Sequence, residues 1–79
     1  MKLENEFTLR EIFTAVLEPP PGEDVTAVRR ISTDHWDSLA HTTLVAAIES
    51  EFNITLSIDD MERLSSFSAA KLLLEEKGL

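Results

Sequence analysis

Residues 34–41, DHWDSLAH, place two acids, both histidines of the chain, a serine and its only tryptophan within eight positions. A serine beside histidines and carboxylates can act as a nucleophile with a general base and an orienting acid. Imidazoles and carboxylates also bind divalent metal ions. As a third interpretation, the serine stands at the start of a helix and is presented to other proteins.

A serine hydrolase or a metal centre fits this segment poorly. His41 lies three residues after Ser38, on the same side of a helix, but the sequence has no Gly-rich nucleophile elbow and no oxyanion site. His35 and His41 are six residues apart, which is a poor spacing for ligands on one helix face, and no second segment completes a tetrahedral set with Asp34 and Asp37. We therefore predict no enzymatic activity and no metal site.

A helix beginning at this segment would display Ser38. Asp37 is a favourable N-cap, since its carboxylate can accept a backbone N–H and suits the helix dipole. Ser38 is then the first helical residue, where free N–H groups favour a phosphate, and His41 is expected on the exposed side. The apolar stripe that would bury this helix consists of Leu44, Val45, Ile48 and Phe52.

A first helix precedes this one. Thr8 and Glu11 have the spacing of a capping box, although the apolar pattern also allows a start near Leu3. Residues 19–22, PPPG, end the helix because proline cannot continue its hydrogen bonds. The connection over residues 22–36 is expected to place three apolar side chains in the core, namely Val25, Val28 and Ile31.

Two shorter helices follow. Residues 52–58 alternate apolar and polar side chains as a strand does, but no partner strand exists, so we predict an extended loop that buries Ile54 and Leu56. A serine followed three residues later by an acid predicts a short third helix from Ser57 to Leu64. Ser65 or Ser66 then caps a last helix. The predicted fold is all-α: a small antiparallel four-helix bundle in a single domain, residues 1–79.

Composition limits the partners. The 79 residues carry a net charge of −8, and residues 34–62 contain seven acids without a single Lys or Arg, which argues against binding nucleic acid. Such a surface is either merely solvated or docks on basic patches of other proteins. No apolar run approaches the roughly 20 residues of a membrane helix and no signal sequence is evident, so we expect a cytoplasmic protein without membrane insertion.

Asp37-Ser38-Leu39 resembles the DSL motif of acyl carrier proteins. The resemblance extends through DSLAHTTLVAAIESEFNITLS, which is similar to the second helix and following loop of that family, and covers residues 5–76. It implies an acyl-carrier-like bundle in which Ser38 carries 4′-phosphopantetheine, transferred from coenzyme A by a magnesium-dependent phosphopantetheinyl transferase. Asp37 and Leu39 would frame the recognised serine. The chain has no cysteine, and the thiol that holds an acyl group would come with the cofactor.

The resemblance also implies partners. A monomeric carrier would meet an acyl-loading ligase or acyltransferase and then synthase enzymes, through a partner face formed by Trp36, Thr42, Thr43, Ala46 and Glu49. His35 replaces a frequent glycine of the family, and Thr43 and Ala46 stand where an acid and a bulky apolar residue are common. These departures indicate a dedicated pathway, such as polyketide, peptide or glycan acylation. Two alternatives stay open: an aminoacyl or peptidyl carrier, and an unmodified acidic helical adaptor.

Overall fold

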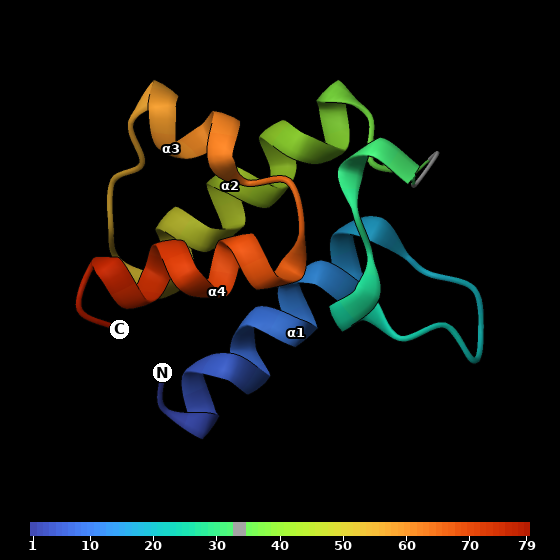
Figure 1. The fold of residues 1–79 in the computed structure, drawn as a ribbon, viewed down its shortest axis with the longest axis horizontal. Helices are drawn as coiled ribbons and strands as arrows, with labels where there is room; N and C mark the ends of the chain where they lie inside the picture. Colours follow the sequence, from blue (N-terminus) through green and yellow to red (C-terminus); the bar gives the residue numbers. More distant parts are fainter. Residues whose placement is uncertain (33–34) are drawn as a thin grey trace.

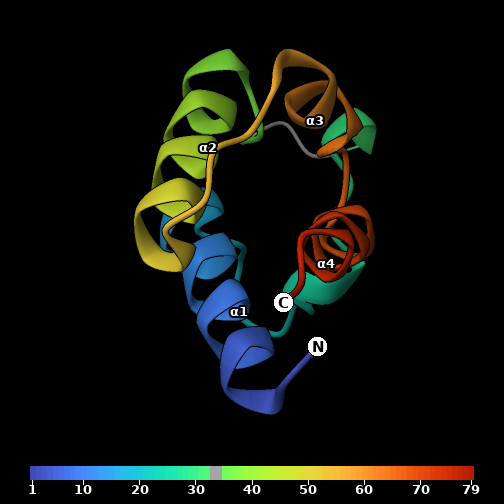
Figure 2. The same cartoon turned by 90° about the vertical axis from the view of Figure 1, so that its left-hand side faces the viewer.

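The computed structural model of the chain describes residues 1–32 and 35–79, which form a small all-α structure (Figure 1). Within these two ranges there is no β-strand, only an isolated bridge between Arg29 and Ser66. The described helices are α1 (Leu3–Leu17), the 3₁₀ turns η1 (Val25–Ala27) and η2 (Arg30–Ser32), α2 (Ser38–Phe52), α3 (Ile58–Arg63) and α4 (Phe67–Glu76). α1 and α2 run in opposite directions and form one side of the molecule, while α3 and α4 form the other (Figure 2).

The first helix begins earlier than the capping pattern indicated. α1 starts at Leu3, and the predicted cap at Thr8 is wrong: its hydroxyl donates to the Glu4 carbonyl at 3.0 Å from inside the helix. The chain leaves α1 through Glu18, which has a left-handed backbone with φ 46°. Pro19 follows at once, so the predicted end of the helix is confirmed, since a residue before proline is disfavoured in the right-handed helical conformation.

Side-chain caps start the other three α-helices, as predicted. The Asp37 carboxylate accepts the Ala40 N–H at 2.8 Å, and the Ser66 hydroxyl accepts the Ala69 N–H at 3.0 Å. Ser57 and Asp60 form a complete capping box, in which each side chain accepts the other residue's backbone N–H. Each cap satisfies N–H groups that the helix itself leaves without partners, and so fixes where the helix begins.

One apolar core unites the four α-helices. Phe13 lies fully buried at its centre, and its ring meets Trp36 and Phe67 edge to face, at centroid distances of 5.6 and 5.3 Å. Such aromatic pairs stabilise a fold by about 1 kcal/mol beyond the area they bury. The predicted stripe of α2 is confirmed for Leu44, Val45 and Ile48, which are buried, whereas Phe52 is half-buried.

The connection between α1 and α2 differs from the prediction in one residue. Val28 is buried and Val25 packs partly against the core, but Ile31 is 96% exposed. The backbone explains the difference, because Arg30 donates its N–H to the Ser65 carbonyl at 2.8 Å and η2 then turns Ile31 outward. The predicted extended segment after α2 is confirmed, with Leu56 buried and Ile54 partly so.

Ion pairs gather on the α3–α4 side and at the chain termini. Lys77 binds Asp60 at 2.9 Å, and Arg63 binds Glu76 with two hydrogen bonds. The N-terminal amine reaches Glu75 at 2.9 Å, which brings both ends of the chain together (Figure 1). Of the described residues, no helix has both the length and the apolar character needed to cross a membrane.

Candidate functional site

Ser38 is the first residue of α2 and its side chain is exposed. The preceding Asp37 is the N-cap, and its carbonyl accepts the His41 N–H at 2.9 Å. Two contacts from Asp37 thus hold the first turn of the helix in place, while the hydroxyl of the next residue faces solvent. The predicted position of Ser38 is confirmed; the helix dipole and the unpaired N–H groups of the first turn favour negative charge there.

Trp36 anchors the chain immediately before this turn. Its indole is only 3% exposed, packs edge to face on Phe13, and donates from Nε1 to His41 Nδ1 at 3.0 Å. The place of Trp36 on the predicted partner face is wrong, since a buried indole is not available to another protein.

His41 joins three parts of the structure instead of lying free on the surface. Its Nδ1 accepts from Trp36, and its Nε2 lies 2.9 Å from the Met61 carbonyl on α3. A carbonyl can only accept, so the ring carries its proton on Nε2. Both ring nitrogens are therefore engaged, and His41 has no nitrogen left to take a proton from Ser38. The prediction of an exposed His41 was wrong.

Within the described residues, the remaining catalytic and metal candidates do not assemble into a site. His35 is exposed on the segment before α2, and Asp34 lies outside the described residues. Among residues 1–32 and 35–79, no group of three or more His, Asp or Glu side chains is placed to hold a metal ion. The described part of DHWDSLAH consists of a helix cap, a buried anchor and an exposed serine.

Leu39 lies next to Ser38 and is 77% exposed, as several other large apolar side chains of this chain are. It borders a groove of about 560 Å³ between the end of α1 and the start of α2. The walls of this groove include Val16, Leu17 and Thr43. Leu39 therefore adds an exposed apolar side chain at the position after Ser38. The sequence pointed to this residue only through the DSL motif.

The rest of the predicted partner face divides into two groups. Thr42, Thr43 and Ala46 are exposed on the outer side of α2, as the prediction requires. Glu49 is half-buried, and its carboxylate accepts the Leu56 N–H at 2.9 Å. It fastens the segment that follows α2, a role that the sequence did not suggest because the two residues are seven positions apart.

The described acids of residues 35–62 do not cover the outer side of α2. Between Leu39 and Ala46 this side carries only uncharged residues, and the carboxylates lie at the ends of α2 and on α3. Asp60 on α3 is engaged: the Ser57 N–H and then Lys77 stabilise its charged form and lower its pKa to about 2. The exposed acids of α3 are Asp59 and Glu62. Any electrostatic docking would involve α3 and the end of α2, not the turn that holds Ser38.

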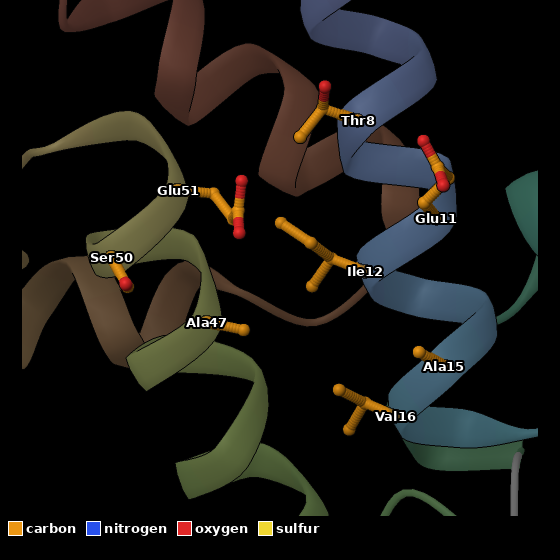
Figure 3. A pocket seen from close by; sticks show the side chains of 8 residues that line it. All are labelled: Thr8, Glu11, Ile12, Ala15, Val16, Ala47, Ser50 and Glu51. Atoms are coloured by element: carbon orange, nitrogen blue, oxygen red, sulfur yellow. The ribbon is translucent and has the colours of Figure 1, made fainter.

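A second groove lies farther along α2, against α1 (Figure 3). Ile12 and Val16 of α1 and Ala47 of α2 point into it, and Glu51 stands at one end. With a volume of about 430 Å³ it is open and shallow, and it begins nine residues after Ser38. At 1.5 Å per residue it lies about 13 Å from the serine along the helix axis.

Comparisons of the chain with family models, with curated proteins and with solved structures yield no match.

Proposed function

We propose that this protein is a discrete acyl carrier protein that holds acyl intermediates as thioesters on a 4′-phosphopantetheine arm at Ser38. The observation that carries the proposal is the placement of Ser38: an exposed hydroxyl at the first residue of a capped helix, held by a buried tryptophan two residues before it. A transferase can reach such a hydroxyl without unfolding the carrier. The resemblance of residues 5–76 to acyl carriers supports the same assignment, and the small all-α arrangement of the described residues is compatible with it.

The residues around Ser38 suit the covalent attachment of a phosphodiester. The α2 N-terminus favours negative charge, and the exposed position leaves room for an arm. The nearby Asp37 carboxylate is turned to the Ala40 N–H, which keeps its charge partly neutralised. When bound, the arm supplies the thiol that a chain without cysteine lacks. The protein itself performs no catalysis in this proposal.

Partner recognition would involve Asp37 and Leu39 as the frame of the serine, with Thr42, Thr43 and Ala46 on the adjoining turns of α2. These side chains are uncharged except for Asp37, so they fit a partner surface that is neutral or apolar near its active site. This neutral face supports a dedicated pathway, such as polyketide, peptide or glycan acylation. The proposed partners are a phosphopantetheinyl transferase, an acyl-loading ligase or acyltransferase, and synthase enzymes.

Intact-protein mass spectrometry tests the proposal. The protein is incubated with coenzyme A, magnesium and a broad-specificity phosphopantetheinyl transferase. We expect the wild type to gain one phosphopantetheine mass and Ser38→Ala to gain none. Ser50→Ala is the matched control, since Ser50 is an exposed serine of the same helix, and it should be modified as the wild type is.

The outcomes separate the proposal from its alternatives. No mass gain with several transferases would overturn it and favour an unmodified helical adaptor. If the arm is attached, loading the holo-protein with a panel of acyl and aminoacyl ligases decides between an acyl carrier and an aminoacyl or peptidyl carrier. Both carriers share the attachment at Ser38 and differ only in cargo.

A further inference from the structure

Three groups enclose the turn that carries Ser38, and we call them the Ser38 clasp: the Trp36 indole, the His41 imidazole and the Met61 carbonyl. The indole donates to His41 Nδ1 at 3.0 Å, and His41 Nε2 lies 2.9 Å from the Met61 oxygen. The two rings also stack, with centroids 6.1 Å apart and an angle of 28° between their planes. One imidazole thus connects the segment before α2, α2 itself and α3.

The clasp includes residues on both sides of Ser38 in the sequence. Trp36 is two residues before Ser38 and His41 three residues after it, so the side-chain hydrogen bond bridges the whole turn. Trp36 is fixed in the core by Phe13, and Met61 lies on a helix that begins with a capping box. The position of Ser38 relative to both the core and α3 therefore depends on the His41 ring.

This arrangement requires a neutral imidazole. His41 must accept at Nδ1 and donate at Nε2, and an imidazolium has a proton on both nitrogens and no acceptor. After protonation the Trp36 N–H and the new Nδ1–H would face each other, so the bond between the segment before α2 and the ring is lost. The contact to the Met61 carbonyl can persist, because Nε2 remains a donor.

We propose that His41 is a positioning residue whose neutral ring holds the Ser38 turn in place, and that protonation of the ring opens the clasp and makes the presentation of Ser38 pH-dependent. This inference rests on the proposed function, since it concerns the serine that would be modified.

Several charged groups on the elements around the ring are engaged elsewhere. Glu49 of α2 lines the groove beside His41 but binds the Leu56 N–H, and Asp60 of α3 binds Lys77. The Asp37 carboxylate caps α2. The other described titratable or charged groups on these elements are His35, Glu51, Asp59, Glu62 and Arg63, of which Arg63 pairs with Glu76. No described carboxylate forms an ion pair with the His41 ring that would hold it charged.

The single tryptophan makes the clasp directly observable. Protonation of His41 changes the charge and the hydrogen bond beside the indole, so we expect Trp36 emission to change when the pH is lowered from about 7.5 to about 5.5. The step should persist in His35→Gln and vanish in His41→Gln. Emission that does not change with pH, or a step that vanishes in His35→Gln, would overturn the inference. The wild type and His35→Gln both keep the clasp, so this test does not depend on the folding of the His41 variant.

The rate of Ser38 modification tests positioning. Glutamine at position 41 keeps a neutral donor toward Met61 and does not titrate. We expect the ratio of the wild-type rate to the His41→Gln rate to fall about fivefold over the same pH range, which corresponds to the loss of one hydrogen bond of about 1 kcal/mol. Taking the ratio cancels the pH dependence of the transferase. A constant ratio would overturn the positioning role. If neither protein is modified at any pH, the proposed function is overturned, and the fluorescence experiment alone then tests the clasp.

Discussion

At the scale of single residues, Asp37 has two roles that substitutions can separate. Its carboxylate caps α2 through the Ala40 N–H, and in the proposed function it also frames Ser38. We expect Asp37→Ala to lower the free energy of unfolding by about 1 kcal/mol, and Asp37→Asn to change it little, because asparagine caps helices about equally well. Urea unfolding measures both. If Asp37→Asn lowered the free energy of unfolding as much as Asp37→Ala does, the capping role would be contradicted.

The same pair of variants probes recognition. If the negative charge of Asp37 contributes to the frame of Ser38, the well-folded Asp37→Asn protein should still be modified more slowly than the wild type. Equal rates would restrict Asp37 to capping.

The lowered pKa of Asp60 predicts how the stability of the fold depends on pH. The Ser57 N–H and Lys77 lower its pKa from 3.8 to about 2, so the folded state binds a proton less readily than the unfolded chain does. A lowered pKa contributes stability above about pH 4, and this contribution is lost as the pH falls toward 2. We therefore expect the melting temperature of the wild type to fall more between pH 4 and pH 2 than that of Asp60→Asn. Asp59→Asn, at the neighbouring exposed position, should behave as the wild type does.

At the scale of the elements, two hydroxyl residues that both resemble caps should respond differently to removal. Thr8 lies inside α1, whereas Ser66 caps α4. We expect Thr8→Ala to leave the free energy of unfolding unchanged or to raise it by up to about 0.5 kcal/mol, since alanine favours helix more than threonine does. Ser66→Ala should lower it by about 1 kcal/mol. Chemical denaturation measures the free energy of unfolding of both variants. A similar decrease in Thr8→Ala and Ser66→Ala would mean that Thr8 caps α1.

Local chemistry accounts for most element boundaries. Asp37, Ser57 and Ser66 begin their helices where the sequence predicts, because a cap acts only on the N–H groups of the next turn. The predicted cap at Thr8 is wrong because α1 extends back to Leu3 without a side-chain cap, and the acids Glu4 and Glu6 of its first turn suit the helix dipole. The predicted burial of Ile31 is wrong because the hydrogen bond from the Arg30 N–H to the Ser65 carbonyl sets the direction of η2. These two residues are 35 positions apart in the sequence.

At the scale of the whole molecule, charge is distributed unevenly. The net charge is −8, ion pairs join Met1 to α4, α1 to α4, and α3 to α4 and to Lys77, and α2 has no Lys or Arg. Salt weakens these exposed pairs, but surface ion pairs of this kind contribute little to stability. Salt also screens the repulsion among the excess acids, which we expect to be the larger effect.

The melting temperature should therefore rise by about 4 °C between about 10 mM and 150 mM salt, which for this chain length corresponds to about 1 kcal/mol. Circular dichroism at the helical band measures it. A temperature that stays constant or falls with added salt would mean that the ion pairs outweigh the repulsion.

The sequence by itself determined the helical class, the caps, the apolar stripes and the position of Ser38, because each depends on residues within one or two turns of one another. Only the tertiary structure decided what surrounds the serine. The Trp36 and Met61 contacts of His41, and the bond from Leu56 to Glu49, join residues whose proximity depends on how the helices pack. The burial of Trp36 likewise depends on Phe13, 23 residues earlier, since a side chain is buried only when a distant element covers it.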